Sequence, residues 1–469
     1  MKLPYNSNDK NSIIQFAKNF IGKSIQQEFE EDLKSLNLIN SDKGQLGKII
    51  EKLYFKYEPN SSAKADFENA GLELKSSGLK QLRNNEYRAK ERLVLSIINY
   101  INAVQEDFEN DFLYGKNGHL LLIFYLYTKG LNQLNSEIKL VGDWKYPAQD
   151  IEIIRQDWEL IKQKITAGKA HELSEGDTFY LGACTKGANA SSIRKQPFSA
   201  VPAKQRAYSL KPNYVNHIIA SIAGNSKEVY GKLIPSLSEV KTNTIEEIVI
   251  SKFKPYYGKS EDEILEIFKL NLNRNAKSFY ANLTKSILGI SLDKEIEEFD
   301  KADIKFKTVR LKENNLPKED LSFPAFKYED IVQETWEDSD FKDILEHKFL
   351  FVFFQYEGEK LVLRKVKFWN MPYSDLIKAE EVWSKTRQIV ANGEIVKEIK
   401  PDKNGKEVRF TNFPNKNFSS VAHVRPHAKD SSDTYPLPKK DKLTKLIEYT
   451  KHCFWLNNRY VRDEIYLKQ

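Results

Sequence analysis

The stretch "NAGLELKSS", residues 69–77, recurs further along the chain as "KADIKFKTV", residues 301–309, with a lysine in place of the glutamate. In an extended strand, residues two apart share one face. We therefore expect Glu73 and Lys75 to point together, while Leu72 and Leu74 point into a core. The recurrence indicates that the chain contains two strands of the same kind.

Two longer pairs of segments support a duplication of the whole domain. The segment "WKYPAQDIEIIRQDWELIKQKITAG" (144–168) aligns without a gap with "WNMPYSDLIKAEEVWSKTRQIVANG" (369–393), and "AYSLKPNYV" (207–215) aligns with "CFWLNNRYV" (453–461). The three pairs follow one another in the same order. The sequence therefore predicts two copies of one domain, residues 1–225 and 236–469, joined by a linker at 226–235 in a stretch rich in Gly, Ser and Pro.

Local patterns predict a mixed α/β architecture. Helical apolar spacing occurs in three segments of the first copy: 16–33, 45–57 and 154–168, the last ending at Gly168. Apolar runs predict strands at "LELK" (72–75), "RLVLSIINY" (92–100) and "HLLLIFYLY" (119–127), and a hairpin around "EGEK" in 348–369. Each copy is thus expected to be a mixed central sheet flanked by helices.

The charge pattern favours a polyanionic partner. The formal net charge of the 469 residues is only +7, but segments 178–227 and 408–429 contain basic residues and no Asp or Glu. Basic segments without carboxylates suit phosphate backbones, the alternative being two solvated loops. No run of about 18 apolar residues exists, which argues against a membrane partner. The two cysteines, Cys184 and Cys453, are typical of the reducing cytoplasm.

Asp66, Glu73 and Lys75 form a candidate catalytic set. Two converging carboxylates provide the oxygen ligands that Mg²⁺ prefers. A neighbouring lysine can orient or help deprotonate a water, so the set can hydrolyse a phosphodiester. The alternative is a half-exposed strand with a salt-bridged face, because Glu137–Lys139 and Glu398–Lys400 have the same acid-x-lysine spacing.

Several motifs carry a resemblance to a known family. They are "DKGQLGKIIE" (42–51), "ADFENAGLELK" (65–75), "IRQDWELI" (154–161), "GDTFYLGACTKGANA" (176–190) and "LKPNY" (210–214). Their order and spacing resemble MutH, the GATC-specific endonuclease of mismatch repair. The stretches "KERLVLSIINY" (90–100) and "QPFSA" (196–200) look closer still to Sau-three-A-type restriction endonucleases. The resemblance implies two tandem restriction-endonuclease-like, MutH-like domains.

The resemblance also implies roles for individual residues in the first copy. Asp66 and Glu73 take the metal-ligand positions, Lys75 that of the catalytic lysine, and Glu51 that of an additional acid, although Glu51 also suits an exposed helical position. The positions that resemble DNA contacts are Lys43, Gly44 and Lys186. The chain departs from MutH at Cys184-Thr185, where MutH has Arg-Pro, so base reading by this loop is expected to rest on Lys186.

The second copy is expected to be catalytically inactive. Lys305 replaces Glu73, and Glu298 stands at the position of Asp66. An ammonium group cannot ligate Mg²⁺. The copy nevertheless has the Arg-Pro of the MutH base-reading loop at Arg425 and Pro426, followed by His427. The resemblance implies an allosteric domain that binds a second target site.

The sequence as a whole predicts a Mg²⁺-dependent type II restriction endonuclease that cuts double-stranded DNA at GATC. One active site per chain and a palindromic target predict that two protein molecules pair on DNA. Two alternatives remain: a MutH-like nicking enzyme of mismatch repair, against which the length argues, and a non-catalytic DNA-binding regulator.

Overall fold

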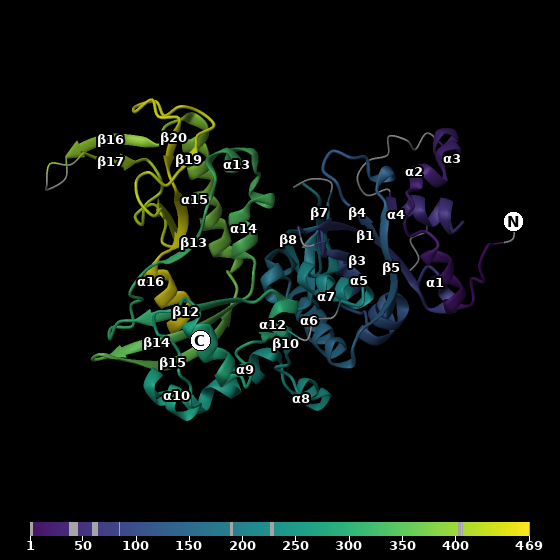
Figure 1. Cartoon of the computed structure of the whole chain (residues 1–469), viewed down its shortest axis with the longest axis horizontal. Helices are drawn as coiled ribbons and strands as arrows, with labels where there is room; N and C mark the ends of the chain where they lie inside the picture. Colours follow the sequence, from purple (N-terminus) through teal and green to yellow (C-terminus); the bar gives the residue numbers. More distant parts are fainter. Residues whose placement is uncertain are drawn as a thin grey trace. The chain divides into compact units, whose positions relative to one another are not determined.

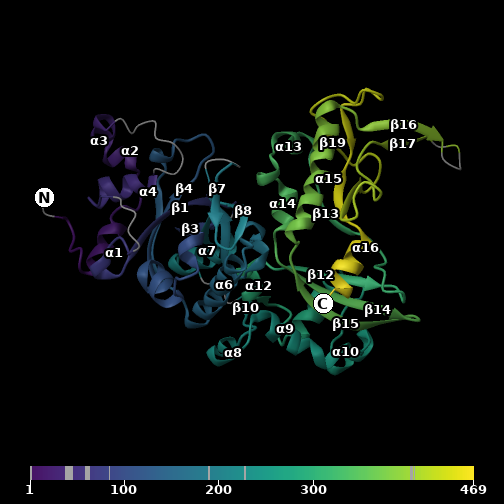
Figure 2. The same ribbon diagram turned by 180° about the vertical axis from the view of Figure 1, so that it is seen from behind.

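A computed structural model describes residues 3–36, 46–58, 64–83, 85–187, 191–225, 229–401, 405 and 407–468. The chain forms two compact units (Figures 1 and 2). Unit 1 comprises Met1–Leu173, Asp177–Ile245 and Ile290–Asp303, and unit 2 comprises Ser174–Gly176, Glu246–Gly289 and Ile304–Gln469. These units are defined by packing, whereas the bounds 1–225 and 236–469 stay a prediction about the two sequence copies.

The main sheet of unit 1 has the strand order β2-β1-β4-β5. Its strands are β1 (Glu73–Gln81), β2 (Tyr87–Ala89), β4 (His119–Leu126) and β5 (Ile138–Lys145). The central pair, β1 and β4, is parallel. Seven of the eight residues of β4 are buried, as expected for a strand covered on both faces.

A second sheet of unit 1 has the order β3-β9-β6, from β3 (Leu93–Ile97), β6 (Leu181–Thr185) and β9 (Arg206–Leu210). The hairpin of β7 (Ile193–Gln196) and β8 (Ser199–Lys204) precedes β9, and β10 (Tyr230–Gly231) pairs with β11 (Glu295–Ile296). The helices of unit 1 are α1 (Lys10–Lys18), α2 (Ile25–Glu28), α3 (Glu30–Ser35), α4 (Leu46–Ile49), α5 (Tyr100–Ala103), α6 (Ala148–Thr166), α7 (Pro212–Ile222), α8 (Leu237–Thr242) and α12 (Glu297–Ala302).

Unit 2 repeats both sheets. One has the order β12-β14-β15, from β12 (Lys305–Leu311), β14 (Phe349–Glu357) and β15 (Lys360–Trp369), and the other has the order β13-β21-β18, from β13 (Leu321–Ala325), β18 (Ala422–Pro426) and β21 (His452–Leu456). Two further strand pairs are β16 (Val396–Pro401) with β17 (Glu407–Thr411) and β19 (Thr434–Pro436) with β20 (Glu448–Thr450). The helices are α9 (Ile245–Phe253), which begins at the last residue of this part of unit 1, α10 (Glu261–Ile267), α11 (Phe279–Ile287), α13 (Tyr328–Gln333), α14 (Asp340–Leu345), α15 (Tyr373–Asn392) and α16 (Asn458–Tyr460).

Strand register supports the sequence repeat at the level of single residues. The first residue of β1, Glu73, is the Cα partner of Leu120, and the first residue of β12, Lys305, is the Cα partner of Phe349 in an equally parallel pair. Two residues before each of these strands the backbone turns through the left-handed region, at Gly71 (φ 59°) and at Asp303 (φ 54°). Lys305 therefore occupies the structural position of Glu73.

The long helices α6 and α15 repeat in the same detail. Each begins directly after a proline and has a buried aspartate in its first turn. The Tyr214 hydroxyl donates to Asp150 Oδ2 at 2.8 Å, and the Tyr460 hydroxyl donates to Asp375 Oδ2 at 2.9 Å. Because buried carboxylates need hydrogen-bond partners, this pair fixes the last helix of each copy on the long one.

One expectation about the first copy is wrong. The single helix predicted over residues 16–33 is three helices: α1 ends at Lys18, and α2 and α3 follow. Gly22 has a left-handed backbone (φ 85°), and Ser24 forms a capping box with Gln27 that starts a new helix. Other expectations are confirmed: the hairpin around "EGEK" is β14–β15, and α6 ends two residues before Gly168. In the described part of the chain, no helix is long and apolar enough to cross a membrane.

Candidate active site

Glu73 stands at the start of β1, with 1% of its side chain exposed. Its Oε1 accepts a hydrogen bond from Lys75 Nζ at 2.6 Å, and its Oε2 accepts one from the backbone N–H of Asp66 at 3.1 Å. Burial raises the pKa of Glu73, against the opposing charge of Lys75. The structure thus brings together the glutamate and lysine that strand alternation places on one face.

Asp66 reaches the same place through a tight turn. The bridge between Phe67 and Leu72 encloses a short 3₁₀ turn, Glu68–Ala70. Asp66 Oδ2 accepts a hydrogen bond from the backbone N–H of Leu74 at 3.0 Å. The backbone N–H of Asp66 in turn donates to Glu73, so each carboxylate accepts from a backbone amide of the segment that carries the other acid. The turn predicted between them is therefore what makes the acids converge.

Two further charged residues interact with this pair. Glu51 lies on a π-helical turn, Ile50–Tyr54, after α4. Burial and then the negative charge of Asp66 raise the pKa of Glu51 to about 7. Lys116 Nζ lies 3.5 Å from Glu73 Oε1. The sequence analysis missed Lys116, although its position just before β4, the parallel neighbour of β1, places it beside the start of β1.

The donor set fits a divalent cation of the Mg²⁺ class. Within the described ranges, no group of three or more His, Cys, Asp or Glu residues is arranged to hold a metal ion. Asp66 and Glu73 nevertheless converge, and the charges of both raise the pKa of Glu51. Clustered carboxylates that repel one another are stabilised by a hard cation, whose preferred ligands are carboxylate oxygens.

Replacing Glu51 by glutamine tests how much the burial of this carboxylate and its repulsion by Asp66 lower the free energy of unfolding. The pKa of Glu51 in the folded protein, about 7, exceeds its value in the unfolded chain. At a pH between these two pKa values, the folded chain therefore binds more protons than the unfolded chain. The free energy of unfolding therefore falls as pH rises through this window. In metal-free buffer we expect Glu51→Gln to stabilise the protein at pH 8.5, by at most about 3 kcal/mol, and to have little effect near pH 4. Thermal unfolding at both pH values is the measurement, and a pH-independent difference would contradict it.

The equivalent place in the second repeat has a different composition. Lys305 and Lys307 stand at the positions of Glu73 and Lys75. Glu298, at the position of Asp66, is buried and accepts hydrogen bonds from the backbone N–H groups of Leu233 and Ile234, at 2.9 and 3.0 Å. The carboxylate of Glu298 is therefore engaged elsewhere, and this place has lysines where unit 1 has its acid–lysine pair.

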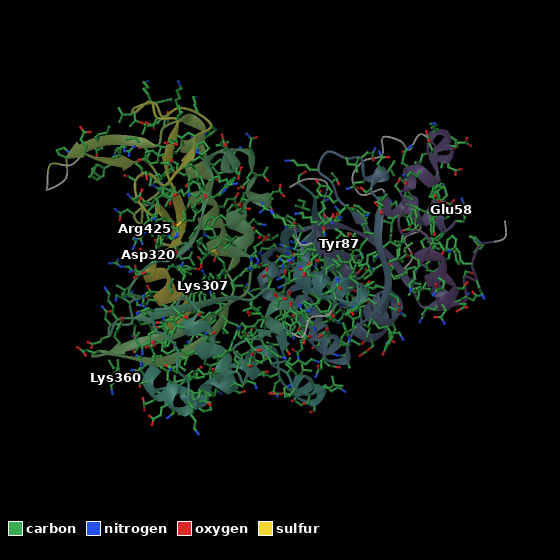
Figure 3. The ribbon with its side chains drawn as sticks, viewed as in Figure 1. Glu58, Tyr87, Lys307, Asp320, Lys360 and Arg425 are labelled. Atoms are coloured by element: carbon green, nitrogen blue, oxygen red, sulfur yellow. The ribbon has the colours of Figure 1, made fainter. Side chains whose placement is uncertain are left out.

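Arg425, near the end of β18 and labelled together with Asp320 in Figure 3, contacts two side chains of unit 2. Its guanidinium carbon lies 3.7 Å from the ring centroid of Trp455, and its Nη1 lies 3.3 Å from Asp320 Oδ2. Burial opposes ionisation of Asp320, but hydrogen bonds from Lys416 and from the Asn458 amide lower the pKa of its carboxyl group. The side chain of Arg425 is still 43% exposed, so an oriented guanidinium faces solvent. Sequence reasoning did not find Asp320 or Trp455 as its supports.

Register relates this arginine to the first repeat. Arg425 is the Cα partner of Cys453, and Cys184 is the Cα partner of Ala207, which aligns with Cys453 in the repeat. Arg425 thus stands in unit 2 where the buried Cys184 stands in unit 1. This supports the expected departure from the Arg-Pro pattern.

The remaining predicted DNA contacts are distributed as follows. Lys186 is exposed just after β6, with its backbone N–H donating to Gln205 O at 2.8 Å. Pro426 ends β18, and the ring of His427 lies 5.3 Å from that of Trp455 in an edge-on contact. Lys43 and Gly44 lie outside the described residues. The structure therefore brings Arg425 and His427 together at Trp455.

Comparisons with known proteins agree with this architecture. The model of the MutH family, described as DNA mismatch repair enzyme MutH, matches residues 55–157 and 288–385, one segment in each repeat. A relative, the type II restriction enzyme Sau3AI of Staphylococcus aureus, is 36% identical across 97% of this chain and 98% of its own length. The predicted fold class of two tandem MutH-like, restriction-endonuclease-like α/β domains is thereby confirmed. The chain belongs to the MutH-like family of Sau3AI-type restriction enzymes and is a site-specific endonuclease.

Proposed function

We propose that the protein is a Mg²⁺-dependent type II restriction endonuclease for GATC, in which the first repeat cuts and the second binds another target site. The observation that supports this division is the contrast at one structural position. Unit 1 has Glu73 paired with Lys75 beside Asp66, and unit 2 has Lys305 and Lys307. A MutH-like nicking enzyme of mismatch repair is the remaining alternative.

In this proposal the residues of unit 1 have separate tasks. Asp66 and Glu73 would hold the metal ion, which, when bound, activates water and neutralises charge developing on the phosphate. The ammonium of Lys75, fixed by Glu73 at 2.6 Å, would orient the attacking water and stabilise the negative charge that develops on it. Glu51 adds a third negative charge beside the pair, and Lys116 a second positive one.

Target recognition would rest on Arg425 in unit 2 and on the basic segment around Lys186 in unit 1. An arginine can donate two hydrogen bonds to O6 and N7 of guanine in the major groove. Arg425 is suited to this because Asp320 and Trp455 limit its rotamers before DNA arrives. Lys186, Lys43 and Gly44 are proposed to contact DNA in unit 1, and Pro426 and His427 in unit 2.

The test of this function is incubation with plasmid DNA, with and without Mg²⁺, followed by sequencing of the ends. We expect no cleavage in chelator and, with Mg²⁺, double-strand ends that all fall at GATC. Ends at another sequence would refute the specificity, and nicks without double-strand breaks would favour the MutH-like nicking enzyme.

Pairing of two protein molecules on DNA is a further expected outcome. One active site cuts one strand per encounter, and a symmetric cut in a palindrome needs a partner related by a two-fold axis. Sedimentation of the Glu73→Ala protein with a GATC duplex should reveal complexes that contain two protein molecules. Complexes with a single protein molecule at saturating protein would show that catalytic domains do not pair.

A further inference from the structure

We propose that Lys305 and Lys307 of unit 2 form a binding site for a backbone phosphate of DNA, at the place where unit 1 cuts. The inference rests on the proposed function, because it assumes that unit 2 binds a second duplex. The ligand is a phosphodiester oxygen, which this site holds and does not hydrolyse.

Backbone geometry supports the equivalence of the two places. Glu73 and Lys75 are the Cα partners of Leu120 and Leu122 on β4, and Lys305 and Lys307 are the Cα partners of Phe349 and Phe351 on β14. Paired residues of neighbouring strands share a face. The two lysines therefore project from the same end and the same face of their sheet as the proposed catalytic pair.

The surroundings of Lys307 favour an anionic ligand. Its ammonium lies 5.8 Å from the ring centroid of Phe323, on the first strand of the other sheet of unit 2. Burial and the positive charge of Lys305 both lower the pKa of Lys307. Burial and a neighbouring positive charge therefore both disfavour the ammonium form of Lys307, and an anion bound beside Lys307 would favour it.

The anion that fits this place is a phosphate of the duplex. Figure 3 labels Lys307, which lies on β12. It also labels Asp320 and Arg425, which belong to the proposed base-reading site of the same unit. An arginine that contacts a base edge is usually accompanied by contacts to backbone phosphates, which fix the register of the duplex. In unit 1 the acids are proposed to bind DNA phosphate through a cation, and in unit 2 the lysine side chains would supply the positive charge directly.

Equilibrium binding of a GATC duplex to the full chain tests the inference. In a Glu73→Ala background, without metal, the proposed function predicts two classes of duplex-binding site, one in each repeat, of which Arg425→Ala removes one. Lys307→Met keeps the apolar stem beside Phe323 and removes the charge. We expect it to weaken this second site roughly tenfold, as for loss of a hydrogen bond to a charged group. The salt dependence (slope of log K against log salt) should fall by about 0.9 per lost phosphate contact.

Two controls separate a phosphate contact from a structural effect. Lys307→Arg should retain the affinity, and Lys360→Ala, at the exposed β14–β15 turn, should have no effect. A neutral methylphosphonate is placed at each GATC linkage in turn. At one linkage it should weaken binding to the protein that has Lys307. At the same linkage it should not weaken binding to Lys307→Met any further. Unchanged affinity in Lys307→Met, or an unchanged response to methylphosphonate, overturns the inference. A single class of duplex-binding site, unaffected by Arg425→Ala, refutes the proposed function instead.

Discussion

Replacing Glu73 by alanine is expected to abolish DNA cleavage while leaving sequence-specific DNA binding intact. Glu73 is buried and contacts both Lys75 and the backbone of Asp66, so its removal disorganises the whole catalytic set. Metal-assisted hydrolysis contributes several kcal/mol to transition-state stabilisation, so the rate should fall by about 10³-fold or more. In the proposed function, DNA affinity depends on basic residues elsewhere in the chain. The measurements are the single-turnover cleavage rate with Mg²⁺ and the dissociation constant without it.

Two variants control this experiment. Glu73→Gln has the same size and can still accept from the Asp66 amide, so its inactivity would reflect the lost charge and not a cavity. Glu137→Ala removes the acid of another acid-x-lysine ion pair, Glu137 with Lys139, and should leave cleavage unchanged. Cleavage by Glu73→Ala near the wild-type rate would refute the catalytic assignment.

Replacing Arg425 by alanine is expected to abolish the preference for DNA with two target sites while basal cleavage persists. Coupling between two binding sites is typically about 1–3 kcal/mol. A bidentate guanine contact is worth about 1–3 kcal/mol, enough to cancel most of it. Asp66, Glu73 and Lys75 belong to the other unit and remain intact. The measurement is the ratio of the cleavage rates on two-site and one-site DNA.

The matched controls for this variant are two other arginine changes. Arg425→Lys keeps a positive charge but cannot form the bidentate contact, so it should lose most of the preference. Arg409→Ala removes an arginine of the same acid-free segment that lies over Tyr449, and it should keep the preference. An undiminished preference in Arg425→Ala would show that this arginine does not read the second site.

Local sequence patterns predicted the elements that position the candidate site. The alternation of polar and apolar residues around Glu73 and Lys75 predicted that both lie on one face of a strand. The apolar run at 119–127 predicted a buried strand, which is β4, the parallel neighbour of β1. The repeat was visible because buried tryptophans and helix-initiating prolines are tightly constrained by packing. These features depend on short-range periodicity, which a single sequence displays directly.

Contacts between distant segments could not be predicted in the same way. Lys116 lies beside Glu73 only because β1 and β4 pair in parallel at one register. Asp320 meets Arg425 across more than a hundred residues of intervening chain. Side-chain spacing contains no information about such pairings. The sequence did not reveal the break between α1 and α2, because the helical spacing of apolar residues continues through Gly22. The backbone nevertheless leaves the helix there, and Ser24 caps the start of α2.

In the proposed division of labour, one repeat cuts DNA and the other binds a second target. Its most direct test is the initial cleavage rate per site of the wild-type protein on two plasmids, identical except that one carries a single GATC and the other carries two. We expect faster cleavage per site on the two-site plasmid, because the second repeat can bind the other GATC of the same molecule. Equal rates per site at every protein concentration would contradict it.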